Sequence, residues 1–148
     1  MPRSESRTAE RHKPNSNTST TTTTSTKARG YTPGRFDYQR LDAFAVAKEA
    51  LGRGDRIGKR LPRGYGKLAD QLRRSLLSAY LNVAEAASRD GADRAARFRT
   101  ARGEASEAAA ALEAVHLLRL ARASEVEPII GLLSRLCAML TRLAGYGK

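Results

Sequence analysis

Residues 71–89 read QLRRSLLSAYLNVAEAASR, and this stretch decides the fold. At 100° per residue, its apolar positions fall on one side of an α-helix and its polar positions fall on the other. The core stripe comprises Leu68, Leu72, Leu76, Ala79, Val83 and Ala86. The opposite polar row comprises Arg74, Ser78, Asn82, Glu85 and Arg89. The stretch therefore predicts an amphipathic helix over about 67–89.

Three more residues of this helix, Leu77, Leu81 and Ala84, lie beside the polar row and away from the core stripe. Leucines at such positions indicate a second buried contact, made with another copy of the chain. The predicted oligomer interface comprises Arg74, Leu77, Ser78, Leu81, Asn82 and Glu85. The alternative is a solvated row of intrahelical pairs such as Glu85 with Arg89, each contributing a few tenths of a kcal/mol.

The helical period continues on both sides of this stretch. The predicted helices cover about 37–57, 67–89, 93–122 and 125–144. The expected apolar stripe of the first helix is Tyr38, Leu41, Phe44, Ala45 and Leu51. Gly52 and Gly54 weaken the end of that helix, and Ser124 is the expected N-cap of the fourth. Gly91 is expected to be a left-handed residue in the turn between the second and third.

Four helices with short connections and no strand signal predict an all-α, antiparallel up-down four-helix bundle over residues 36–148. A three-helix bundle with a loose first helix is the main alternative. Residues 1–35 have a different composition, and the low-complexity segment NSNTSTTTTTSTK occupies 15–27. This basic Thr/Ser-rich tail is expected to be disordered, because it lacks the apolar residues that would offset the entropy of ordering.

The chain of 148 residues carries 27 Lys and Arg against 15 Asp and Glu, a formal net charge of +12. The tail has 7 basic and 2 acidic residues, so both it and the bundle are basic. Such a charge attracts polyanions such as nucleic acid, an anionic membrane or an acidic protein. A GC-rich coding bias towards arginine and alanine is the other explanation.

The sequence also bears on the location of the protein. The single cysteine, Cys137, excludes an intramolecular disulfide framework. No apolar run approaches the ~18 residues of a transmembrane helix, and no secretory signal is recognisable. We therefore expect a cytoplasmic protein that has no membrane partner.

No catalytic constellation is recognisable, so we predict a protein that is not an enzyme and has no cofactor or metal. The segment GRGDRIGKR (52–60) lacks the glycine spacing and the Ser/Thr of a phosphate-binding loop. His116 stands alone, and Cys137 lies near an apolar stripe, where a small packed side chain is expected.

Two segments resemble a family of small bacterial four-helix bundle proteins. The family includes proteins encoded in intervening sequences of large-subunit ribosomal RNA genes and the accessory variability determinant of diversity-generating retroelements. Its first pattern is close to Q-L-R-R-A-x-x-S-x-x-x-N-x-A-E-G, and it is matched by Gln71, Leu72, Arg73, Arg74, Ser78, Asn82, Ala84 and Glu85. Its second pattern is matched by Phe98, Ala101, Gly103 and Glu107. Ala86 and Glu104 replace a glycine and a serine that are usual in the family.

The resemblance implies a bundle that assembles into a ring, commonly of five subunits. Similarity to the best-understood branch also implies a basic adaptor that binds nucleic acid and a reverse transcriptase.

We therefore predict a homo-oligomer that binds RNA or DNA mainly through phosphates, with little sequence preference and a steep salt dependence. The candidate contacts are Arg73, Arg74, Arg97, Arg99 and Arg102, with weaker contributions from Arg60, Arg63 and Lys67. No aromatic residues interleave with these arginines, so base stacking is not expected. The alternative function is a protein-interaction scaffold whose ring holds a partner protein, with nucleic acid incidental.

Overall fold

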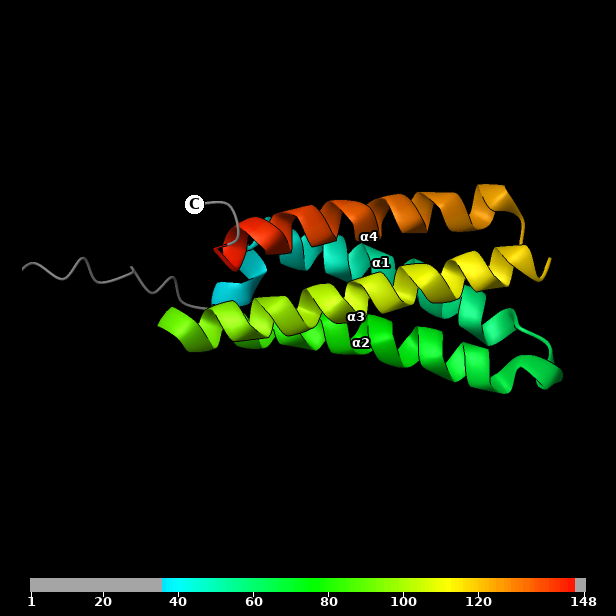
Figure 1. The fold of residues 1–148 in the computed structure, drawn as a ribbon, viewed down its shortest axis with the longest axis horizontal. Coiled ribbons are helices and arrows are strands. Elements are labelled where there is room, and N and C mark those ends of the chain that lie inside the picture. The colour runs from blue at the N-terminus through cyan, green and yellow to red at the C-terminus, as the bar shows by residue number, and fades with distance from the viewer. Residues whose placement is uncertain (1–35, 146–148) are drawn as a thin grey trace, which may run out of the picture. The chain divides into compact units, whose positions relative to one another are not determined.

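The computed structural model describes residues 36–145, which form four α-helices and two short 3₁₀ turns (Figure 1). The elements are η1 (Asp37–Arg40), α1 (Asp42–Arg60), η2 (Arg63–Tyr65), α2 (Gly66–Ala87), α3 (Gly91–Leu117) and α4 (Ala123–Leu143). No strand occurs between residues 36 and 145. The predicted disordered tail lies outside the described residues.

Successive helices run in opposite directions, and each helix packs against two neighbours (Figure 1). The packing order is α1, α2, α3, α4 and back to α1. The predicted all-α, up-down four-helix bundle is therefore confirmed. The three-helix alternative is wrong, because α1 packs against both α2 and α4. None of the helices in the described part of the chain has the length and apolar character that a bilayer span needs.

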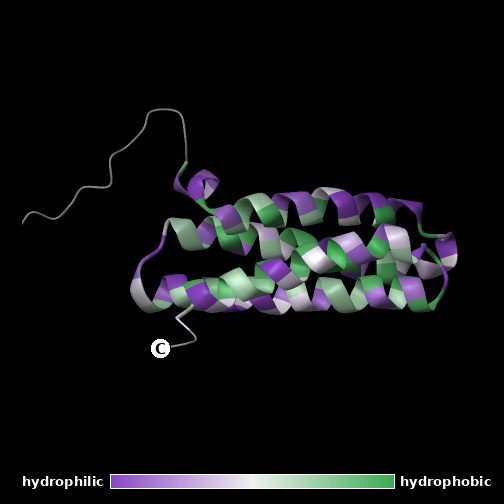
Figure 2. Ribbon diagram, turned by 90° about the horizontal axis from the view of Figure 1, so that it is seen from above, coloured by the Kyte–Doolittle hydropathy of each residue, from purple (hydrophilic) through white to green (hydrophobic). Residues whose placement is uncertain are grey.

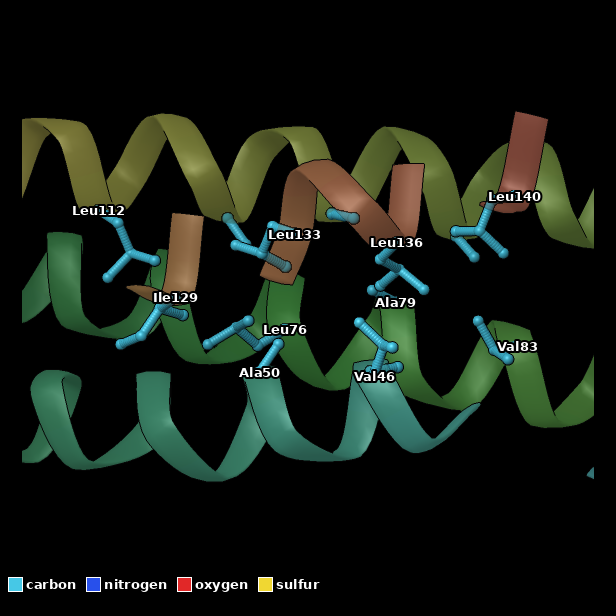
Figure 3. Packing of buried hydrophobic residues seen from close by; sticks show 14 of the residues in the cluster. Val46, Ala50, Leu76, Ala79, Val83, Leu112, Ile129, Leu133, Leu136 and Leu140 are labelled. Atoms are coloured by element: carbon cyan, nitrogen blue, oxygen red, sulfur yellow. The ribbon is translucent and has the colours of Figure 1, made fainter. Parts of the chain in front are cut away.

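The core is a single cluster of apolar side chains from all four helices. Figure 3 shows Val46 and Ala50 of α1, Leu76 of α2, Leu112 of α3 and Leu133 of α4 pointing into the shared interior. On each helix apolar and polar residues alternate around the axis (Figure 2). The core side of α3 consists of Phe98, Ala101, Ala105, Ala108, Leu112 and Val115, all fully buried. Because alanine is small, it lets neighbouring helices approach this side closely.

The sequence led us to expect that α1 would weaken at its glycines, but the helix continues through them. It runs through Gly52 and Gly54 to Arg60. Gly54 is buried against Leu76 of α2, and a Cβ placed at Gly58 would come within 2.8 Å of Arg73 Cγ. Close packing against α2 thus offsets the low helix propensity of glycine.

Several predicted helix ends are also wrong, for local reasons. The chain before Asp42 forms η1 instead of the start of α1. Helix α3 stops at Leu117 because Arg119 adopts a left-handed conformation with φ of 58°, and Leu120 N–H then bonds to the Val115 carbonyl. Helix α4 starts at Ala123, earlier than an N-cap at Ser124 would allow. Gly91 has the expected positive φ of 54° but is the first residue of α3.

Candidate functional site

The outer side of α2 is the first part of the candidate site. Leu77 and Leu81 are 47% and 53% exposed, and Ala84 is half-buried. Leu77 borders an open hollow between α1 and α2, which Asp55, Arg73 and Arg74 also line. A large apolar surface therefore lies in solvent on a single chain, flanked by charged residues.

The polar row of α2 binds largely to its own helix. Asn82 Nδ2 donates to the Ser78 carbonyl at 2.9 Å and lies 3.3 Å from Ser78 Oγ. Asn82 Oδ1 is buried and accepts no hydrogen bond within the described residues. Ser78 and Asn82 are both only partly exposed.

Glu85 is the centre of an ionic network at the end of α2. Arg89 Nη2 lies 2.6 Å and Arg97 Nη2 lies 3.4 Å from Glu85 Oε1, and Arg89 also contacts Asp93 at 2.9 Å. Hydrogen bonds to Glu85 and then to Asp93 raise the pKa of Arg89 above its ordinary value. The alternative to an oligomer interface was a row of intrahelical pairs, and its Glu85–Arg89 pair is present. Glu85 therefore has ionic partners within its own chain.

Arg73 and Arg74 are neighbours in sequence but pair with different helices. Arg73 Nε donates to Asp55 Oδ1 of α1 at 2.7 Å. Arg74 Nη2 donates to Gln71 at 2.9 Å and lies 3.6 Å from Glu107 Oε1 of α3. Both residues line the hollow between α1 and α2, but Arg73 pairs with α1 whereas Arg74 pairs with α3.

The remaining candidate nucleic-acid contacts are not gathered on one face. Arg97 belongs to the Glu85 network, and Arg102 Nη1 donates to Thr141 of α4 at 3.3 Å. Arg60 pairs with Glu125 at 2.8 Å, also on α4. By contrast, Arg63, Lys67 and Arg99 are exposed and make no ion pair with any residue from 36 to 145. The eight predicted residues therefore point into several grooves of the bundle.

Sequence reasoning missed five basic residues at one end of the bundle, namely two pairs and Lys59. Arg53 and Arg56 of α1 line a hollow of about 590 Å³ against α4. Arg119 and Arg122 line a smaller hollow over the α3–α4 connection. The charge run in 53–67 could have revealed the first pair, but only the topology brings the second pair to the same end.

The described part of the chain offers no cluster of metal ligands. Residues 36–145 contain no group of three or more His, Cys, Asp or Glu side chains placed to hold a metal ion. Cys137 is half-buried, with Sγ 3.5 Å from Ser106 Oγ, in line with the expected packing role. His116 is exposed at the end of α3.

The fold defines this chain as a small all-helical bundle protein. A protein-family model described as 23S rRNA-intervening sequence protein matches residues 44–142, and the chain belongs to that family. The matched region begins in α1 and ends in α4, so it covers all four helices. No curated protein matches the chain.

Proposed function

We propose that the protein is a non-enzymatic, homo-oligomeric bundle that binds nucleic acid through basic residues. The observation that carries this proposal is the excess of exposed basic side chains without acidic partners. Arg63, Lys67 and Arg99 stand free of ion pairs in the described part of the bundle, and the whole chain has a net charge of +12. Free guanidinium and ammonium groups are the usual contacts of phosphate oxygens.

RNA is the first polyanion to test, since the description of the family refers to ribosomal RNA. Binding would be led by phosphates, because the ring pairs in residues 36–145 involve only Phe36, Tyr38, Phe44 and Tyr80, none of which adjoins Arg63, Lys67 or Arg99 in sequence. We therefore expect similar affinities for RNA strands of different sequence.

Titration of the protein with labelled RNA and DNA over a range of salt concentrations tests this function. We expect log K to fall linearly with log salt, with a slope of about −3 or steeper, because each neutralised phosphate releases close to one counterion. Absence of binding at low salt, or binding with a flat salt dependence, would contradict the proposal.

The oligomer rests on a separate observation, the exposed leucines of α2. Leu77 and Leu81 expose apolar area beside the hollow that Arg73 and Arg74 line, and a second copy would bury it. A ring of about five subunits is the form that we propose. Light scattering at micromolar concentration would give several times the mass of the chain, whereas a monomer would remove this part of the proposal.

A second candidate function is a protein-interaction scaffold. It is favoured by Leu117 and Leu118 at the end of α3, which are 81% and 48% exposed. A binding partner such as a reverse transcriptase that is retained after nuclease treatment, and released by Leu117→Glu, would support the scaffold over the nucleic-acid function.

A further inference from the structure

The positive charge of the bundle is concentrated at one end. We define the loop end as residues 53–67 and 116–127, which contain the α1–α2 and α3–α4 connections and lie together at the right of Figure 1. The loop end has 8 basic and 3 acidic residues, a net of +5. The other residues between 36 and 145 have 11 basic and 10 acidic residues, a net of +1. Outside the loop end the described bundle is thus almost neutral.

The basic side chains of the loop end line connected hollows. The hollow between α1 and α4 is bounded by Arg53, Arg56, Lys59 and Arg60. It shares Glu125 with the hollow over the α3–α4 connection, which Arg119 and Arg122 line. A third hollow, lined by both Arg60 and Glu125, lies between them. These residues therefore form one continuous surface across three elements.

Several cations of the loop end have no competing carboxylate, although Arg63 lines none of the three hollows. Arg56, Arg63 and Arg119 are exposed, and none makes an ion pair or side-chain hydrogen bond with any other described residue. Glu125 is the one acidic residue that lines the hollows, and it is already paired with Arg60 at 2.8 Å. The surface therefore carries unpaired positive charge that can bind an anionic ligand.

The backbone at Arg119 gives independent support. Its φ of 58° lies in the left-handed region, which costs a non-glycine residue about 1 kcal/mol or more. Glycine is the usual residue at this position of a helix C-terminus. An arginine that is kept in a strained backbone conformation and points a free guanidinium to solvent indicates that its charge is used.

We propose that the loop end is the surface that binds the phosphate backbone of nucleic acid; this location rests on the proposed function. Charge complementarity selects the ligand, since a nucleic-acid strand presents regularly spaced phosphates to a row of guanidinium groups. The exposed Leu117 and Leu118 adjoin this surface but do not line its hollows. The arginines of the α2–α3 groove are paired with Glu85 and Glu107. Arg53, Lys59 and Arg60 of the loop end are paired as well, so the free charge there rests on residues such as Arg56, Arg63 and Arg119.

Two triple variants of the full chain test this location. The loop-end triple carries Arg56→Gln, Arg63→Gln and Arg119→Gln. The control triple carries Lys48→Gln, Arg135→Gln and Arg142→Gln, which are also exposed and without ion pairs in the described residues. Both remove three positive charges, so they change the net charge equally. Circular dichroism establishes that both remain folded.

The probe is a labelled single-stranded 30-nucleotide RNA. We expect the loop-end triple to bind at least about tenfold more weakly, with a salt slope reduced by about 2 to 3, and the control triple to bind within about threefold of the original chain. Equal weakening by both triples, or a larger effect of the control, overturns the location while binding itself stands. No binding by the original chain overturns the proposed function. If the original chain binds poly-glutamate as tightly as RNA, and the loop-end triple loses this affinity too, nucleic acid is overturned as the specific ligand.

Discussion

Gly54 sets the distance between α1 and α2. It is buried, and an added Cβ would collide with Leu76 Cδ1 in the core. Gly52 lies two residues earlier in the same helix and is exposed, and a Cβ added there would meet no neighbouring side chain within 4 Å. The two glycines therefore have opposite consequences, although both lie in the interior of α1.

We predict that Gly54→Ala lowers the free energy of unfolding by about 1–3 kcal/mol, because an overpacked core must shift. The matched variant Gly52→Ala should raise it by about 0.5–1 kcal/mol, since alanine has the higher helix propensity. Urea denaturation measures both values. Stabilisation by both variants would show that α1 can move away from Leu76 at little cost.

Asp55 connects two cations. Lys59 Nζ lies 2.6 Å from Asp55 Oδ2 and Arg73 Nε lies 2.7 Å from Asp55 Oδ1. These hydrogen bonds, that of Lys59 first, lower the pKa of Asp55 below its ordinary 3.8. The charged form is thus favoured in the folded state, and its contribution is fully present above the unfolded pKa.

We predict that Asp55→Asn reduces stability at pH 7 by about 0.5–1 kcal/mol, the range of partly exposed ion pairs. The difference should vanish as the pH falls through the lowered pKa of Asp55, because the original carboxyl group is then neutral as well. Unfolding curves from pH 7 down to pH 2 measure this. Asp70→Asn is the control, since Asp70 makes no ion pair within residues 36–145 and should show no loss at pH 7.

Glu125 competes with any anion that approaches the loop end. A hydrogen bond from the Arg122 backbone and then one from Arg60 lower its pKa, so it is ionised at neutral pH. We predict that Glu125→Gln strengthens RNA binding several-fold, because it releases Arg60 while an amide oxygen can still accept from the Arg122 N–H. Glu107→Gln, which removes the partner of Arg74, is the control and should leave the affinity nearly unchanged in fluorescence titrations. Larger strengthening by Glu107→Gln would place the contact on the α2–α3 groove.

At the scale of the element, α2 illustrates what the sequence could predict. Its core positions follow from 100° periodicity, and Leu72, Leu76 and Val83 are indeed buried. The stripe of α1 was harder to identify. Ala45 is exposed, whereas Ala43, Val46, Ala47, Ala50 and Ile57 are buried without having been predicted. Alanine and glycine have low hydrophobic contrast, so the periodic signal that marks a buried side is weak in α1.

The outer side of α2 also allows a test of the proposed oligomer. We predict that Leu77→Glu combined with Leu81→Glu lowers the mass measured by light scattering to that of the monomer. The reason is that the introduced carboxylates would be buried in the proposed oligomer interface. Leu117→Glu is the matched control on α3, and it should leave the mass unchanged. An unchanged mass in the α2 double variant would remove this side of α2 from the interface.

At the scale of the whole molecule, the bundle topology determines where charges meet. The short connections and helix count were readable from the sequence, and so was the antiparallel order. The gathering of Arg56 with Arg119 was not, because these residues are 63 positions apart and only the closed order of the helices brings both to the loop end. The predicted arginines do not form one patch, because Asp55 pairs with Arg73 between α1 and α2, whereas Glu107 and Glu85 pair with Arg74 and Arg97 between α2 and α3.

The closed packing order also has a consequence for stability. Since α1 contacts both α2 and α4, we predict that its central amides exchange hydrogen as slowly as those of the other helices, through global unfolding. Hydrogen-exchange mass spectrometry of the full chain measures this for peptides covering 43–57 and 123–140. Much faster exchange in α1 would contradict this prediction and would favour a three-helix core with a loosely attached first helix.

The left-handed Arg119 also has an evolutionary consequence. Replacement by glycine would relieve the backbone and make the bundle more stable, yet it would remove a cation from the loop end. Selection for heat resistance alone would therefore favour glycine here, while selection for ligand affinity would retain arginine. If the loop end binds nucleic acid as proposed, stability and ligand affinity make opposite demands on this single turn.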